Sequence, residues 1–333
     1  QADETYFRDT AHGFLAWSIA TLFAAGVLAI SSTGWLFQPV GEASQGASTP
    51  GNGGTITINA TGTSSHGLQL DTSFLVAHGA IDITALNTST LHTFRMEGAS
   101  GSIKSNSDIN IQAGYATGSS LGTWGLVVDT GRSIQSTGGN ITINARGSSG
   151  GFYVSTSATS IVAGNHLTDP TAGGNITLNT SGGSGYGTQM VAGSLVANGS
   201  ISLTSTGGLE GAYIYGAGLL KANGDITIDA RSTTTGNWAY YQSDSRFIQS
   251  TAGNISITAT GGHGIYFNGG GVAAGNSTTA PTAGGSITIN STTTGSHPDG
   301  AGLRMDTAGT AILAYDDITI YSNAASAGMN GSA

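Results

Sequence analysis

Short stretches in which apolar and polar residues alternate recur along most of the chain. The commonest form is Ile-x-Ile, as in GGTITIN, GGNITIN and AGNISIT. This alternation places both isoleucines on one face of a β-strand. Ten such stretches occur, and successive copies begin 25 to 35 residues apart. Their first apolar residues are Ile56, Ile81, Ile109, Ile141, Ile176, Ile201, Ile226, Ile255, Ile287 and Ile318.

Each repeat contains two further alternating stretches. The second usually starts with glycine, as in GLQL from Gly67, GFYV from Gly151 and GIYF from Gly264. The third, such as SFLVA, RSIQS or TAILA, comes just before the next Ile-x-Ile. Glycine, asparagine and serine, which favour turns, separate the three stretches. Each repeat therefore predicts three short strands that form one triangular coil.

A repeat period of 20 to 50 residues is typical of a solenoid. Stacked coils place each strand beside its counterpart in the next coil, parallel and about 4.8 Å away. The sequence thus predicts an all-β fold, a parallel β-helix of about ten coils over residues 54–333. The rod would be on the order of 50 Å long. Isoleucine would fill its interior, and stacked threonine and asparagine side chains would form ladders outside.

A β-sandwich or propeller is the alternative with the same composition, because both also use many short strands and turns. Their strands pair antiparallel through tight hairpins, and the chain lacks paired strands around two-residue turns. Two nearly identical phrases also favour the solenoid. AGN…PTAGG occurs at residues 163–174 and again at 274–285, as if one loop were copied together with a block of coils.

The N-terminal segment, residues 1–37, differs from the repeats. From Phe14 to Ser32 it is apolar, uncharged and long enough to cross a membrane as one helix. We expect an apolar helix used for membrane insertion or assembly, and residues 38–53 form a linker rich in small residues. The alternatives are a signal peptide and a buried helix or end cap. The residues that characterise the segment are Phe14, Trp17, Leu22, Phe23, Leu28 and Trp35.

Composition narrows the possible functions. Only 8% of the residues are charged, 55 are glycine and none is cysteine. Such a chain exposes Ser, Thr, Asn and backbone, which suits β-structure with many turns. The formal net charge is -9, and the nine basic residues form no run, so we expect no nucleic-acid partner. Without cysteine the chain forms neither disulfides nor thiolate metal sites.

The stretch GGNITINARGSSGGFYVSTSATSIVAGN, followed by TAGGNITLNTSGGSG, resembles the repeats of filamentous-haemagglutinin-like adhesins. These are large secreted proteins of bacterial two-partner systems. The resemblance covers residues 51–320 and implies a right-handed parallel β-helix at the cell surface or outside the cell. The family's N-terminal secretion domain, with its NPN-type motifs, is not found here.

Parallel β-helices also occur in polysaccharide lyases and hydrolases, which need converging carboxylates. The acidic residues of this chain are scattered. Asp108, Asp225 and Asp317 each precede an Ile-x-Ile strand, where a short polar turn residue is expected. The seven histidines show no spacing typical of a metal site. We therefore expect neither catalytic residues nor a metal or cofactor.

The residue in the middle of the second strand points outward by alternation, and it is often aromatic or basic. Exposed tyrosines along a rod can stack on sugar rings or pack against a neighbouring molecule, since Tyr combines a large apolar area with a polar tip. Ordinary ladder packing on a solvated sheet is the plainer interpretation. WAYY, residues 238–241, is ambiguous in register. The candidate binding residues are Arg95, Tyr153, Tyr213, Tyr215, Tyr266 and Arg304.

The sequence thus predicts a non-enzymatic bacterial surface or extracellular protein, an adhesin or filament subunit. The apolar segment would contact membrane lipid or neighbouring subunits, and we expect a homo-oligomer. No end cap follows YDDITIYSNAASAGMNGSA, which suggests truncation or head-to-tail stacking. A glycan-binding or polysaccharide-degrading protein, and an accessory chain of a membrane complex, are the alternatives.

Overall fold

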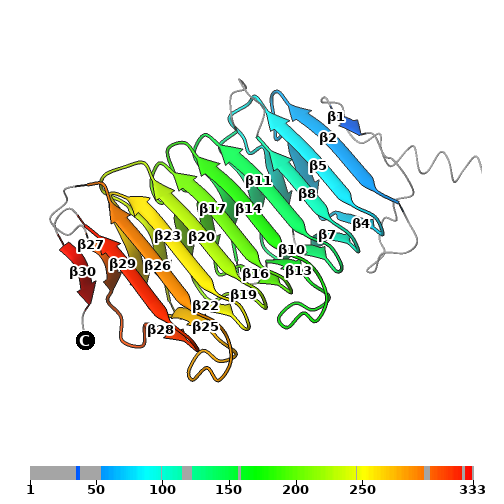
Figure 1. Cartoon of the computed structure of the whole chain (residues 1–333). Coiled ribbons are helices and arrows are strands. Elements are labelled where there is room, and N and C mark those ends of the chain that lie inside the picture. Colours follow the sequence, from blue (N-terminus) through cyan, green and yellow to red (C-terminus); the bar gives the residue numbers. More distant parts are fainter. Residues whose placement is uncertain are drawn as a thin grey trace, which may run out of the picture.

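The computed structural model describes residues 35–37, 54–98, 100–114, 122–156, 159–244, 246–295, 301–324 and 327–331. These residues form an all-β parallel solenoid, in which three sheets run side by side along the axis (Figure 1). The described strands make nine complete three-strand turns and the first two strands of a tenth. At about 4.8 Å per turn, nine turns are about 45 Å long.

The Ile-x-Ile strands form the first sheet. In spatial order its strands are β1 (Trp35–Phe37), β2 (Ile56–Gly62), β5 (Ile81–Asn87), β8 (Ile109–Ala113), β11 (Ile141–Gly147), β14 (Ile176–Gly182), β17 (Ile201–Gly207), β20 (Ile226–Ser232), β23 (Ile255–Gly261), β26 (Ile287–Thr293) and β29 (Ile318–Asn323).

The other two strands of each turn form the second and third sheets. The second sheet comprises β3 (Leu68–Asp71), β6 (Phe94–Glu97), β9 (Trp124–Val128), β12 (Gly150–Val154), β15 (Thr188–Val191), β18 (Ala212–Tyr215), β21 (Trp238–Ser243), β24 (His263–Asn268), β27 (Ala301–Met305) and β30 (Ala327–Gly331). The third comprises β4 (Phe74–Ala77), β7 (Gly101–Ser105), β10 (Arg132–Ser136), β13 (Ser160–Ala163), β16 (Ser194–Ala197), β19 (Leu220–Ala222), β22 (Phe247–Ser250), β25 (Gly271–Ala274) and β28 (Ala311–Ala314).

The stacking of the ten predicted isoleucines is confirmed. Each pairs in register with its counterpart in the next turn, from Ile56 opposite Ile81 to Ile287 opposite Ile318. From β2 onward every strand pair within the described residues is parallel, which excludes the sandwich and propeller alternatives. Because one face of each strand is buried, a shift of one residue would expose the whole apolar set.

The core is a single column of side chains from all three sheets. Isoleucines such as Ile141 and Ile143 of β11 are fully buried, as are Phe152 of β12 and Ile134 of β10. Burying each such side chain contributes about 1.5 to 3 kcal/mol, so the repeated apolar positions supply the main driving force for folding.

A ladder of side-chain oxygens runs beside the first sheet, at the residue just before each of the last eight Ile-x-Ile strands. The backbone N–H of Asn140 donates to Asp108 Oδ1 at 2.7 Å, and that of Asn175 donates to Asn140 Oδ1 at 2.9 Å. These side chains therefore bind the backbone of the following turn. Asp108 and Asp225 are polar turn residues, as expected from the sequence. Its members are Asp108, Asn140, Asn175, Ser200, Asp225, Asn254, Ser286 and Asp317.

Strand β1 was not anticipated from the sequence. It pairs antiparallel with β2, so that Trp35 lies opposite Ala60 and Phe37 opposite Ile58. Trp35, predicted to flank an apolar helix, therefore lies in a strand. The backbone edge of β2 that faces away from β5 is occupied by a strand running in the opposite direction, which differs from the open edge expected for head-to-tail stacking.

The two similar loops have the same local structure. In the first, Asn165 Oδ1 accepts the N–H groups of Thr171 and Ala172, at 2.9 and 3.2 Å. In the second, Asn276 Oδ1 accepts those of Thr282 and Ala283, at 2.9 and 3.3 Å. The loops leave the third sheet four turns apart, on the same side of the rod (Figure 1). This agreement supports growth of the solenoid by copying a block of turns.

Candidate functional site: an outward aromatic column

The outward residues in the middle of the second-sheet strands lie in one column along the rod. Parallel pairing without slippage brings each beside its counterpart in the next turn. Gln189, for example, lies between Tyr153 and Tyr213. The column reads Gln69, Arg95, Val127, Tyr153, Gln189, Tyr213, Tyr241, Tyr266 and Arg304.

Aromatic rings make a continuous surface over β18, β21 and β24 and the segment just before β15. The rings of Tyr213 and Tyr241 stack with centroids 4.7 Å apart, and Tyr241 meets Tyr266 edge-on at 5.1 Å. Tyr215 lies 4.9 Å from Tyr213 on the same strand. Rings from the strand starts extend the surface: Tyr186 contacts Tyr213, and Trp238 contacts Tyr266. We call this the aromatic patch: Tyr186, Tyr213, Tyr215, Trp238, Tyr241 and Tyr266.

The aromatic patch brings together three of the predicted tyrosines, Tyr213, Tyr215 and Tyr266. Tyr241 and Trp238, whose register was ambiguous in the sequence, also belong to it. Tyr240 between them points inward and is fully buried, where its hydroxyl donates to Gln242 Oε1 at 2.8 Å. Tyr186 was missed, because it precedes strand β15 and shares no alternation with it.

At its C-terminal end the aromatic patch meets a cation. The guanidinium of Arg304 lies over the Tyr266 ring, 5.0 Å from the centroid, and forms an ion pair with Asp306. The Tyr266 hydroxyl donates to Asp306 Oδ2 at 3.0 Å. Arg304 is therefore held in place by both a ring and a carboxylate, and its charge is neutralised.

Arg95 and Tyr153 lie nearer the N-terminal end of the column than the rings of the aromatic patch. Arg95 forms ion pairs with Glu97 at 2.9 Å and Asp129 at 3.2 Å, and Glu97 also accepts a bond from Gln69. Tyr153 packs against Trp124 at 5.2 Å. Arg95 thus belongs to a charged cluster, whereas Tyr153 forms a separate aromatic pair with Trp124.

Burial raises the pKa of three phenols in the aromatic patch, Tyr186, Tyr213 and Tyr266. It raises the pKa of Tyr213 to about 12, with smaller effects from Tyr241 and Tyr186. The pKa values of Tyr186 and Tyr266 are also raised, chiefly by burial. Burial likewise raises the pKa of Glu210, whose charge adds to the effect on Tyr186. With their pKa values raised, the hydroxyls of Tyr186, Tyr213 and Tyr266 stay protonated at neutral pH and can donate hydrogen bonds.

The amide of Gln189 and the hydroxyls of Tyr213 and Tyr215 are among the polar groups on this face that form no hydrogen bond within the described residues. All three residues are partly exposed. The aromatic patch therefore offers apolar ring area together with unused donors and acceptors.

Two buried arginines lie where the second sheet turns into the third, and sequence reasoning did not find them. Arg132 is 0% exposed and Arg246 is 1% exposed. Their guanidinium groups occupy space left by glycines of neighbouring turns, Gly101 for Arg132 and Gly218 for Arg246. Arg246 donates to the backbone oxygens of Gly216 at 3.3 Å and Tyr215 at 3.4 Å, which holds the end of β18 beneath the aromatic patch.

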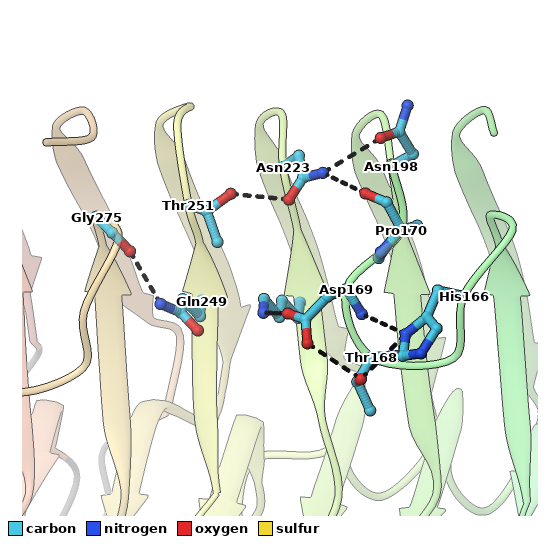
Figure 2. A network of polar contacts seen from close by, with 10 residues as sticks. His166, Thr168, Asp169, Pro170, Asn198, Asn223, Gln249, Thr251 and Gly275 are labelled. Carbon is cyan, nitrogen blue, oxygen red and sulfur yellow. Dashed lines mark hydrogen bonds and ion pairs between the residues drawn. The ribbon is translucent and has the colours of Figure 1, made fainter. Parts of the chain in front are cut away.

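The outer face of the third sheet is covered in part by the first of the duplicated loops. Asp169 forms an ion pair with Lys221 of β19, so the loop, which leaves β13, crosses β16 (Figure 2). Asn223 Nδ2 donates to Pro170 O at 2.8 Å. Beneath this crossing Val196 is fully buried, although its position in β16 faces outward. These contacts hold the loop over Val196 and so cover an apolar position on the outer face of the third sheet.

The remaining predictions concern the N-terminal apolar segment and metal binding. Phe14, Trp17, Leu22, Phe23 and Leu28 lie outside the described residues, so the apolar helix stays a prediction. In the ranges given above, the structure contains no helix long and apolar enough to cross a membrane. Those same ranges hold no group of three or more His, Cys, Asp or Glu side chains placed to bind a metal ion.

Comparisons of the chain with protein-family models, with curated proteins and with solved structures found no match.

Proposed function

We propose that this chain is a non-enzymatic structural protein of the bacterial cell surface or extracellular space, an adhesin or filament subunit. The N-terminal segment attaches it to membrane lipid or to neighbouring subunits. One observation carries the proposal: the polar groups of successive turns bind one another. The oxygen ladder beside the first sheet links eight turns through Asp, Asn and Ser side chains.

The ion pairs support the same proposal. Arg95 joins its own turn to the next through Asp129, and Lys221 is paired with Asp169 of the loop that crosses β16. Ion pairs between different turns oppose bending of the rod and hold its turns together along the axis. A rigid rod that presents a long repetitive surface suits an adhesive or filamentous role.

Electron microscopy of the purified chain tests the proposal. Negative-stain images at rising protein concentration, with and without detergent, should show rods at least about 45 Å long. The rods should join into filaments or gather at detergent micelles through the N-terminal segment. Globular particles, or rods that stay single under every condition, would contradict it.

An activity assay tests the non-enzymatic part. The protein is incubated with a panel of neutral and acidic polysaccharides, and new reducing ends and unsaturated products are measured. We expect no products. Steady product formation would favour the polysaccharide-degrading alternative instead. Glycan binding is the second candidate function, and the aromatic patch is the observation that favours it.

A further inference from the structure

The dimensions of the aromatic patch suit an extended chain molecule. Tyr213, Tyr241 and Tyr266 follow one another along the rod with ring centroids 4.7 and 5.1 Å apart. This spacing is comparable to the length of one sugar residue in an extended polysaccharide. Tyr186, Tyr215 and Trp238 widen the surface on both sides.

The chemistry of the aromatic patch also suits a sugar. A pyranose ring offers C–H groups that pack on aromatic rings and hydroxyls that both donate and accept hydrogen bonds. Much of each ring face is already used, since Tyr213 and Tyr241 stack on one another. Ring edges, the unpaired hydroxyls of Tyr213 and Tyr215 and the unpaired amide of Gln189 therefore provide most of the contact.

The charges around the aromatic patch favour an uncharged ligand. Arg304, at one end, is neutralised by Asp306. Glu210 lies close enough to Tyr186 and Tyr213 for its charge to raise their pKa values. An acidic polysaccharide would find no unpaired cation among these residues and would meet the Glu210 carboxylate.

We propose that the aromatic patch and Gln189 bind a segment of a neutral polysaccharide, lying along the rod across β15, β18, β21 and β24. This proposal rests on the adhesin form of the proposed function, and it names the class of ligand that the adhesin would bind.

Affinity electrophoresis tests the site. The full chain is run in native gels containing soluble xyloglucan, galactomannan or mixed-linkage β-glucan, and in gels containing the acidic polygalacturonate. We expect retardation by at least one neutral polysaccharide and none by polygalacturonate. Tyr213→Ala removes the ring with most contacts in the aromatic patch and should weaken binding about tenfold or more.

Matched variants separate binding from folding. Gln189→Ala and Tyr213→Phe keep the rings and should weaken binding severalfold without lowering the thermal midpoint. Tyr321→Ala, an exposed tyrosine of the first sheet, should have no effect. Three results would overturn the site: no retardation by any neutral polysaccharide, equal retardation by polygalacturonate, or an equal loss in Tyr321→Ala.

Sedimentation analysis of Tyr213→Ala tests whether a second copy of the chain, rather than a glycan, occupies this face. If the variant loses self-association and the wild type binds no glycan, the aromatic patch is a contact between copies and the sugar site is wrong. Filaments or rods seen by microscopy without glycan binding would likewise reject this site and leave the structural proposal standing.

Discussion

Single glycines decide where the buried arginines lie. A Cβ on Gly218 would lie 2.5 Å from Arg246 Nη2 and 2.3 Å from the backbone oxygen of Gly193, distances that real Cβ atoms do not show. The absent side chain therefore makes room for a guanidinium inside a stack of turns only about 4.8 Å apart.

Gly218→Ala should displace Arg246 and part of the neighbouring backbone. We expect a loss of about 1 to 3 kcal/mol in the free energy of unfolding, the usual cost of overpacking. Urea unfolding measures it. Gly236→Ala is the control, because nothing lies within 4 Å of a Cβ there, and it should change stability by less than about 0.5 kcal/mol. Equal effects of the two substitutions would reject this account.

His92, which stacks on His66, gives the N-terminal turns a sensitivity to acid. The rings of His66 and His92 lie 5.4 Å apart and nearly parallel. Burial, helped by His66 and Arg95 and opposed by Asp129, lowers the pKa of His92 to about 4. Because this pKa lies below the value of 6.5 expected in the unfolded chain, the stabilisation is complete above pH 6.5 and is lost as the pH falls toward 4.

The pH dependence of unfolding tests this effect. The full shift would correspond to about 3 kcal/mol, and partial exposure of the pair reduces it to about 1 to 2 kcal/mol. His92→Phe keeps a ring in the stack and removes the titrating group. The loss of stability between pH 6.5 and 4 should be smaller in this variant by that amount, as measured by urea unfolding at several pH values.

At the scale of the elements, the register of the first sheet was predictable from the sequence. The register of WAYY, the two buried arginines and strand β1 were not. Ile-x-Ile and its spacing identify the first sheet, because only one register buries both isoleucines. WAYY has no such alternation, since both Ala239 and Tyr240 are buried. The buried arginines were not predictable either, because their partner glycines come from other turns. Strand β1 follows an apolar segment that carries no strand signal.

The oxygen ladder has one member in each of eight turns. Asn175 takes part in it twice: its N–H donates to Asn140, and its Oδ1 accepts the N–H of Ser200 at 2.7 Å. Only the second bond depends on the side chain. The side chain can therefore be changed while the strand pairing is kept.

Asn175→Ala should lower the free energy of unfolding by about 1 kcal/mol, because the Ser200 N–H loses its acceptor. Asn175→Asp keeps an acceptor oxygen and should lie close to wild type at neutral pH. Thermal unfolding followed by circular dichroism compares the two. If both variants lose the same stability, the bond to Ser200 is not what matters.

At the scale of the whole molecule, each turn contacts mainly the turns on either side of it. The stability of such a solenoid is approximately a sum over turns and their interfaces. The fold, its core and its outward column were predictable because they follow from that repetition. The aromatic patch was predictable in part, since its position follows from the register but its ring contacts depend on rotamers.

Deletion of one whole turn should be tolerated. Removing residues 201–225 joins Ser200 to Ile226, keeps a Ser before the Ile-x-Ile strand and brings Ile226 beside Ile176. We expect a cooperatively unfolding β-protein one turn shorter, with weaker glycan binding because Tyr213 and Tyr215 are gone. Deletion of residues 201–213, which is half a turn, should prevent folding. Circular dichroism and size-exclusion chromatography distinguish the outcomes.

The oxygen ladder also has a direction. Each side chain accepts from the turn that follows it, never from the one before. A whole turn added or removed at this residue therefore keeps donor and acceptor matched at the junction. A change of length by whole turns thus leaves this set of hydrogen bonds continuous, whereas a change by part of a turn interrupts it.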